Sequence, residues 1–395
     1  MSRRRSVIVS AARTPVGAFL GGLSSVPAPK LGAVAIKEAI KRAGIEPEKV
    51  DEVIMGNVIT GGEGQAPARQ ATIFAGLPVT TPAMTINKVC GSGLKSIMLA
   101  EQIIAAGDSN IIVAGGQENM SLAPYALHKA RTGYRLGNGE LVDLMIKDGL
   151  WDVYNDFHMG EAADICAKEC NISREEQDEF AAESYRRALK AMDEGWFKDE
   201  IVPVEVPGKK GEVIVVEEDE SPRNVKFDKI PKLKPAFTPD GTVTAANASS
   251  INDGAAAVVV VAEEVAEKMN LKPMARIIAH AQASTEPKYF TKAPVYAIKK
   301  VLEKAGMKIE DIDLWEINEA FAVVTLLAIR ELGLDPAKVN VHGGAVSIGH
   351  PIGASGARIL TTLLYALKRY NKKYGVASLC IGGGEAVAMI VENID

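Results

Sequence analysis

Residues 35–44 read AIKEAIKRAG, and residues 297–306 read AIKKVLEKAG. Both stretches place apolar residues at helical spacing and end in a glycine, the usual left-handed stop of a helix. Each then passes through a short acidic segment, EKVD at 48–51 or EDID at 310–313, into an apolar stretch, VIMG at 53–56 or LWEI at 314–317. The chain therefore repeats a helix–loop–strand unit, and the two copies lie about 262 residues apart.

A second pair of matches follows in the same order. CGSG at 90–93 and its helix resemble GASG at 353–356 and its helix, and IIVAGG at 111–116 resembles ASLCIGG at 377–383. An ordered set of matches argues for a duplication, and its period is far too long for a solenoid. Because strands alternate with helices in each copy, we predict a duplicated α/β protein whose halves are helix-covered layers of parallel strands. Loop ends of two such halves can converge on one site.

The stretch between the copies, about residues 117–243, does not repeat. It contains a predicted polar helix over 173–194, opened by the capping signal SREE at 173–176, and a charged, Pro/Gly-rich segment over 207–239. Thr242–Val261 then returns as a strand to the first half. We predict an N-terminal half of residues 1–116 plus 242–270, an inserted loop lobe of residues 117–241, and a C-terminal half of residues 271–395.

Composition excludes several functional classes. The 395 residues carry a net charge of −5 and 5% aromatic side chains, which gives neither the basic surface nor the stacking platforms expected for nucleic-acid binding. No uninterrupted apolar run approaches the roughly 18 residues that a membrane helix needs. Four cysteines do not form a disulfide framework, which predicts a reducing, cytoplasmic location.

Cys90 is the candidate nucleophile. It lies in NKVCGSGL, residues 87–94, where an apolar stretch breaks at glycines and a helical pattern begins. A thiol at a helix N-terminus faces unpaired N–H groups and the positive end of the helix dipole, which favour the reactive thiolate. The alternative is a small buried thiol without a role. The flanking glycines, which let a ligand approach closely, favour the nucleophile.

Three further residues are candidates for the same site. His350 lies just ahead of a helix between residues that restrict the backbone, so it is either a general base for a thiol or a histidine bonded to its own loop. Cys380, in LCIGGG at 379–384, reads by itself as a core thiol and beside the other two as a second acid/base. Asn318 follows an apolar strand, where it can orient a water or polarise a carbonyl, or equally cap the next helix.

Together these segments resemble the thiolase family. The matching motifs are NKVCGSGL at 87–94, NASSINDG at 247–254, NEAF at 318–321, GGAVSIGHPIGASG at 343–356 and LCIGGG at 379–384. The resemblance implies a five-layer α-β-α-β-α fold. It implies that Cys90 accepts the acyl group, that Cys380 is the second acid/base, and that His350 activates Cys90. It also implies that Asn318 holds a water for the thioester oxygen and that the backbone N–H groups of Cys90 and Gly382 bind an oxyanion.

The reaction implied by this resemblance is the reversible Claisen condensation of two acetyl-CoA molecules to acetoacetyl-CoA and CoA, through an acetyl-Cys90 intermediate. CoA thioesters are then substrates, and no cofactor is expected. No metal is expected either, because Cys166 and Cys170, four residues apart on a helix, lack a matched ligand set. Family resemblance also implies a homodimer or homotetramer.

The substrate pocket can be placed by the same resemblance. His158 and Met159 resemble the acyl and pantetheine wall of short-chain thiolases, and Phe290 resembles the animal mitochondrial type. Ser249 is implied to hydrogen-bond pantetheine, and Arg223 to lie near the adenine. The positions that match the lining of the CoA tunnel are Leu150, Arg223, Leu233, Phe237, Ala245, Ser249, Ala320 and Phe321.

Two other functions remain open at this point. One is a 3-oxoacyl-CoA thiolase of broader chain length, as in fatty-acid degradation, which His158 and Met159 disfavour. The other is a non-catalytic CoA-binding scaffold for a partner enzyme, which the presence of Cys90, His350 and Cys380 together disfavours. His342, which precedes the glycines of the GGAVSIGHP motif, is interpreted as a packed loop histidine.

Overall fold

The computed structural model describes residues 4–395. Its main strands hydrogen-bond into one continuous sheet of ten strands, whose two halves, each called a sheet in its own right, join only where β1 pairs with β13 through two residue pairs, Val7 with Arg276 and Ile8 with Ala275. The N-terminal half has strand order β4-β3-β5-β12-β1, and the C-terminal half has β14-β15-β16-β13. The strands are β1 (Ser6–Arg13), β3 (Glu52–Gly56), β4 (Ala83–Ile86), β5 (Ile111–Asn119), β12 (Asn252–Ala262), β13 (Ala275–Ser284), β14 (Leu314–Ile317), β15 (Tyr374–Ile381) and β16 (Glu385–Asn393).

The two halves have equivalent topology, which confirms the predicted duplication. β3 is parallel to β5 as β14 is to β15, and β12 is antiparallel to β5 as β16 is to β15. The prediction of wholly parallel strands is wrong, because both sheets are mixed. The reason is visible between β15 and β16, which are joined by Gly382–Gly384 alone. Such a link allows a tight antiparallel return but not the crossover that parallel strands require.

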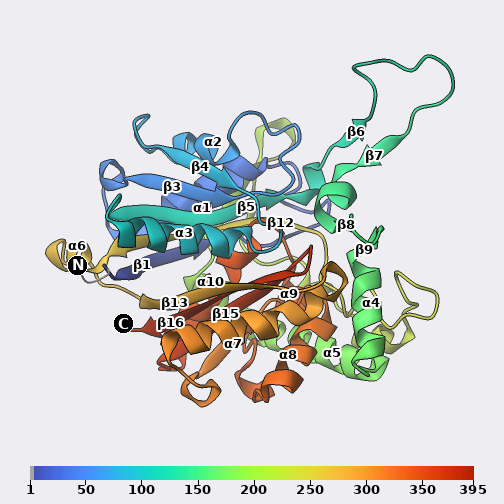
Figure 1. Cartoon of the computed structure of the whole chain (residues 1–395). Helices are drawn as coiled ribbons and strands as arrows, with labels where there is room; N and C mark the ends of the chain where they lie inside the picture. Colours follow the sequence, from blue (N-terminus) through green and yellow to red (C-terminus); the bar gives the residue numbers. More distant parts are fainter. Residues whose placement is uncertain (1–3) are drawn as a thin grey trace.

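Helices cover and separate these sheets to give five layers (Figure 1). α1 and α2 cover the outer face of the N-terminal sheet, α3 and α10 pack on each other between the sheets, and α7 and α8 cover the C-terminal sheet. Alternation along β3 explains this burial: Val53 and Met55 pack towards α1, whereas Ile54 packs into the central layer. The helices are α1 (Ala28–Ala43), α2 (Pro67–Phe74), α3 (Ser92–Ala106), α7 (Ala293–Ala305), α8 (Ala322–Leu332) and α10 (Ser355–Arg369).

The repeated helices end as their sequences predict. α1 stops at Gly44 with φ 65° and α7 at Gly306 with φ 64°, both left-handed. The equivalent of α1 in the second copy is thus α7. By length and composition one helical stretch among the described residues, Val89–Ala106, is apolar enough to cross a membrane. It contains α3, whose apolar faces are covered by β3, β5, β12 and α10.

The inserted lobe contains helices and short hairpins. α5 starts as predicted, with Ser173 and Glu176 forming a reciprocal capping box. β12 returns beside β5 and β1, as expected for Thr242–Val261, while the division of the chain into three units stays a prediction. The β6–β7 hairpin extends away from the body (Figure 1). The lobe elements are α4 (Met159–Glu169), α5 (Arg174–Asp193), β6 (Tyr125–Leu127), β7 (Leu141–Asp143), β8 (Trp151–Asp152), β9 (Phe157–His158), β10 (Val204–Pro207) and β11 (Val213–Val216). Shorter elements are β2 (Gly17–Ala18), α6 (Glu263–Lys268) and α9 (Ala345–Ile348).

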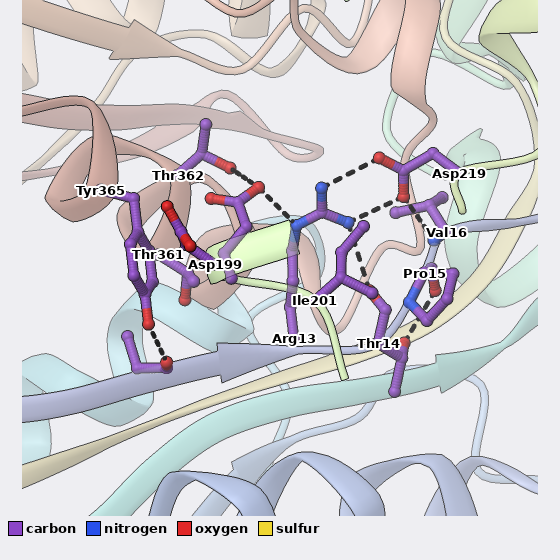
Figure 2. Close-up of polar contacts among 12 residues, drawn as sticks. Arg13, Thr14, Pro15, Val16, Asp199, Ile201, Asp219, Thr361, Thr362 and Tyr365 are labelled. Carbon is purple, nitrogen blue, oxygen red and sulfur yellow. Dashed lines mark hydrogen bonds and ion pairs between the residues drawn. The ribbon is translucent and has the colours of Figure 1, made fainter. Parts of the chain in front are cut away.

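A buried arginine ties this lobe to both halves (Figure 2). Arg13, at the end of β1, donates to Glu200 at 2.7 Å and to both oxygens of Asp219 at 2.7 and 2.9 Å. Thr362 of α10 donates to Glu200 at 3.2 Å. Removal of one partner from such a buried ion pair typically costs about 3–5 kcal/mol of stability, because a charge is left uncompensated. The lobe that carries His158 is therefore held rigidly against β1 and α10.

Candidate active site

A cavity of about 340 Å³ opens where the two halves and the lobe meet, and Cys90, His350 and Gly382 share its wall. Nine predicted binding residues line it: Leu150, His158, Met159, Phe237, Ala245, Ser249, Phe290, Ala320 and Phe321. Eight further lining residues were not predicted: Met120, Gly149, Ala236, Thr244, Ala248, Ser250, Ile251 and Ile352. Several of these lie within or next to the quoted motifs, which was the signal that could have identified them. A larger, more open hollow of about 570 Å³ beside Trp196 and Tyr370 contains no cysteine.

Cys90 lies at a strained turn in front of α3. Val89 has φ 43°, a left-handed conformation that is unusual for a β-branched residue and typical of strain near functional groups. Burial raises the pKa of the Cys90 thiol to about 11. Backbone N–H groups of Gly382 and of Cys90 itself oppose this shift, and the charge of Glu118 adds to it. Desolvation therefore opposes the expected thiolate preference of Cys90, which stays a prediction.

Glycines bring the two central helices together at this site. A Cβ atom on Gly356 would lie 2.2 Å from the backbone nitrogen of Leu94, and one on Gly93 would lie 2.7 Å from that of Ala357. Both distances are too short for any side chain, so α3 and α10 approach this closely only because both positions are glycine. The N-termini of the two repeated helices, with Cys90 before one and His350 before the other, therefore meet at one cavity.

His350 is held on its backbone and on one ring nitrogen. Its N–H donates to Asn252 Oδ1 at 2.8 Å, and its Nδ1 lies 2.5 Å from Ser355 Oγ. Because Ser355 Oγ donates to the Pro351 carbonyl, its lone pair must accept from Nδ1–H. Nε2 then carries the free lone pair, and it has no protein partner. Burial and the nearby Arg358 lower the pKa of His350 to about 3, which favours the neutral imidazole with its Nε2 lone pair free and makes that nitrogen a weak base.

Cys380 and Asn318 are buried and are not among the residues that line the cavity. Cys380 is fully buried near the end of β15, and burial followed by the neighbouring Cys90 raises its pKa well above the usual range. Asn318 follows β14, and both polar atoms of its side chain are buried without a protein partner. It does not cap α8, which begins at Ala322 with Phe321 in the cap position. Of the two sequence interpretations of Asn318, the helix cap is therefore wrong.

A buried carboxylate that sequence reasoning missed supports this arrangement. Glu118, at the end of β5, accepts from Asn57 Nδ2 at 3.0 Å and from the backbone N–H groups of Val58, Ile59 and Gly353 at 3.0, 3.1 and 2.8 Å. Burial raises its pKa to about 7, but all four partners are donors, which only the ionised carboxylate accepts without conflict. Glu118 therefore ties the loop after β3 to the loop between His350 and α10. The sequence feature that could have identified Glu118 is an acidic residue at the end of an apolar strand.

Other motif residues serve the fold. Asn247 Nδ2 donates to Asp178 at 2.9 Å, and Glu319 accepts from Ser184 and Asn340 at 2.7 and 2.8 Å. His342 is buried between the rings of Trp196 and Tyr370, as the packed interpretation predicts. His158 is the N-cap of α4: its Nδ1 accepts from the Gly160 N–H at 3.0 Å, and its ring stacks on Phe237 with centroids 4.7 Å apart.

Two predicted tunnel residues are not part of this cavity. Arg223 is exposed and paired with Asp193 and Glu218, each at 3.0 Å, and Leu233 lies on the surface. Their roles stay predictions. Across residues 4–395, no three His, Cys, Asp or Glu side chains are grouped as a metal site would require.

Comparison with known proteins adds a family assignment to this geometry. The family model described as "Thiolase, N-terminal domain" matches residues 6–264, and "Thiolase, C-terminal domain" matches residues 271–393. An acetyl-CoA acetyltransferase of Cupriavidus necator is 57% identical over 98% of this chain and 99% of its own length. An acetyl-CoA acetyltransferase of Pseudomonas aeruginosa is 54% identical over 97% of this chain and 98% of its own length. A mitochondrial acetyl-CoA acetyltransferase of Bos taurus is 55% identical over 98% of this chain and 91% of its own length.

Proposed function

The chain belongs to the thiolase family, and from that premise we propose that it is an acetyl-CoA acetyltransferase, an acyltransferase that forms and cleaves acetoacetyl-CoA. The observation that carries this proposal is the cavity in which Cys90, His350 and Gly382 meet beneath a largely apolar wall. A thiol beside a neutral imidazole, with backbone donors directed at the sulfur, is suited to acyl transfer from a thioester.

The first half-reaction acylates Cys90. His350 Nε2 takes the thiol proton as the sulfur attacks the acetyl-CoA carbonyl, and the imidazole later returns that proton to the departing CoA thiolate. The backbone N–H groups of Cys90 and Gly382 bind the oxyanion that develops, where each such donor is typically worth about 10²–10³-fold in rate. Because Cys90 has its pKa raised to about 11, proton removal must accompany the attack.

The second half-reaction forms the carbon–carbon bond. Cys380 gives its thiol proton to His350 Nε2, and the resulting thiolate removes an α-proton from a second acetyl-CoA. The enolate then attacks the acetyl group on Cys90, and the Cys90 thiolate that leaves takes the proton back from the His350 imidazolium. The enolate oxygen is bound by His350 and by a water held on Asn318, whose amide has no protein partner. The negative charges that develop lie on oxygen or sulfur, where N–H donors can stabilise them, so these residues need no cofactor and no metal for the reaction.

Cavity shape supports a short acyl chain. Met159, Phe290 and Phe321 are buried side chains in the wall, and the two phenylalanine rings pack edge to face with centroids 6.1 Å apart. Turnover of acetoacetyl-CoA should greatly exceed that of 3-oxohexadecanoyl-CoA. A preference for the long substrate would instead establish the broader 3-oxoacyl-CoA thiolase.

The acyl-enzyme gives a direct test against the scaffold alternative. Incubation with acetyl-CoA should add one acetyl group to the intact mass of the wild-type chain, and peptide mapping should place it on Cys90. Cys90→Ala should lose both this adduct and turnover by at least about 10⁴-fold. The matched variant Cys170→Ala should retain both. Absence of an adduct and of turnover in the wild type would leave only CoA binding.

We also propose a cytoplasmic homotetramer. All four cysteines are unpaired, as is usual in a reducing compartment. The projecting β6–β7 hairpin exposes apolar side chains, with Leu136 98% and Leu141 65% accessible, which suits contact with another subunit. Light scattering should give four chains per particle, and a tip variant, Leu136→Asp with Leu141→Asp, should give smaller particles. A monomeric wild-type protein would contradict this assembly.

A further inference from the structure

Two thiols outside the proposed active site lie in contact on one helix. Cys166 Sγ and Cys170 Sγ on α4 are 3.8 Å apart. Residues four apart in an α-helix share a face, but their Cβ atoms lie about 5–6 Å apart, beyond the roughly 3.5–4.5 Å that a disulfide requires. Cys170 is the C-cap residue of α4, with φ −92° and ψ 4°, so it lies outside the regular helix. Closure of a disulfide therefore requires the last turn of α4, including the hydrogen bond from the Cys170 N–H to the Cys166 carbonyl, to unwind so that the two Cβ atoms approach.

The surroundings of this pair leave the Cys170 sulfur accessible to a reagent and shield the Cys166 sulfur from solvent. Cys170 is half-buried, whereas Cys166 is buried. The Lys292 ammonium lies beside both sulfurs and places a positive charge where a thiolate would form. The other charged side chains nearby are Glu169, which receives the Tyr289 hydroxyl, and Arg330, which donates to the Cys170 carbonyl at 2.9 Å.

We propose that Cys166 and Cys170 form a modification site, a dithiol that exchanges with a low-molecular-weight disulfide such as oxidised glutathione and closes to a disulfide within α4. Cys170, as thiolate, attacks one sulfur of oxidised glutathione, which forms a mixed disulfide and releases one glutathione thiolate. Cys166 then loses its proton and attacks the Cys170 sulfur, releasing the second glutathione. Two electrons pass from the two protein thiols to one glutathione disulfide, and two glutathione molecules leave as thiols.

This site is connected to the proposed active-site cavity by packing. Cys166 belongs to the same apolar cluster as Met159, the first residue of α4, and Phe290. Both of these side chains line the cavity. Phe290, Thr291 and Lys292 are consecutive residues of the 3₁₀ segment Pro287–Lys292, which packs against α4. Closure of the disulfide moves the end of α4 against this segment, so the cavity wall should respond.

Trypsin gives a direct readout, because Lys168 lies between the two cysteines. The wild-type chain is incubated with oxidised glutathione, its remaining thiols are alkylated, and it is digested without reduction. Residues 148–168 and 169–174 should appear as one cross-linked peptide that dithiothreitol separates. Cys170→Ser should give no such peptide. If the wild type also gives none while both cysteines are alkylated separately, the proposed site is wrong.

The pH dependence of closure provides a second check. Burial raises the pKa of the Cys166 thiol to about 12, so the second exchange step is the slow one. The cross-linked peptide should therefore accumulate roughly tenfold faster for each pH unit between 7 and 9. A rate that does not rise with pH would contradict attack by Cys166.

The coupling to the cavity is read by turnover and rests on the proposed function. Wild type and Cys170→Ser are treated in parallel, because Cys90 and Cys380 react equally in both. Wild type should lose about two- to tenfold more acetoacetyl-CoA turnover than the variant, and dithiothreitol should restore it. Equal losses would overturn the coupling. Absence of turnover before treatment would instead refute the proposed function, while the cross-linked peptide still decides the site.

Discussion

The ends of β5 and β15 occupy equivalent places in the two halves, yet they carry different chemistry. β5 runs past its glycines to Glu118, whose carboxylate binds backbone N–H groups of the facing loops. β15 reaches Cys380 and then turns through three glycines into β16. The helices that precede β5 and β15 differ in the same way, since Cys90 precedes α3 and His350 precedes α10. Duplication thus supplied one scaffold twice, and the two copies then specialised, so neither half contains a complete site.

The prediction with the largest expected effect in this comparison concerns the different roles of Cys90 and Cys380. Cys380→Ala should still be acetylated on Cys90 by acetyl-CoA, because acylation needs only Cys90 and His350. Condensation should fall by about 10³-fold, since the base for the α-proton is lost. Mass spectrometry follows the adduct, and solvent deuterium exchange into acetyl-CoA follows proton removal. Cys170→Ala is the thiol control and should behave as wild type. Normal condensation by Cys380→Ala would move the base elsewhere.

The second prediction concerns the helix end of the N-terminal half. Burial raises the pKa of Cys90 to about 11, so the thiol is protonated at pH 7 and the thiolate fraction grows as pH rises. In His350→Ala, alkylation of Cys90 by iodoacetamide should accelerate about tenfold per pH unit from 7 to 10. Peptide mapping quantifies the Cys90 adduct at each pH. A plateau near pH 7 or 8 would mean that the helix dipole outweighs burial after all.

The third prediction tests whether the end of β5 positions groups of the other half. In Glu118→Gln, an amide N–H₂ must face either the N–H donors of Val58 and Gly353 or those of Asn57 and Ile59. This conflict should lower the free energy of unfolding by about 1–3 kcal/mol. It should also lower turnover by about tenfold through displacement of the His350 loop. Glu205→Gln, at an exposed position of β10, is the matched control and should change neither. Unchanged turnover in a stable Glu118→Gln variant would limit Glu118 to folding.

The smallest expected effect concerns backbone strain at Val89. At φ 43°, any L-residue with a Cβ is disfavoured by roughly 1–2 kcal/mol, whereas glycine is not. The free energy of unfolding of Val89→Gly should therefore equal that of Val89→Ala or exceed it by about 1 kcal/mol, although glycine has one carbon fewer than alanine. Denaturant unfolding of both variants checks this order. The usual order, with alanine the more stable, would show that the turn is relaxed.

Several features of the fold could be predicted because they depend on local patterns. The helix stops at Gly44 and Gly306, the capping box at Ser173 and the strand before Asn318 all follow from short-range backbone preferences. The parallel sheets were mispredicted because strand direction depends on how a connection passes over the sheet. Periodicity alone does not contain that information. Glu118 was missed because a single acid in an apolar strand reveals nothing about the donors that surround it.

The sequence by itself determined that the chain is a duplicated α/β protein and predicted which segments carry the proposed nucleophile and acid/base groups. It could do so because repeats and glycine-bounded motifs can be recognised from the order of residues alone. Only the tertiary structure decided that burial raises the pKa of Cys90 and lowers that of His350, that His350 Nε2 has no protein partner, and that Arg223 lies outside the cavity. These properties depend on desolvation and on partners from distant segments, which exist only when the two copies pack helix end against helix end.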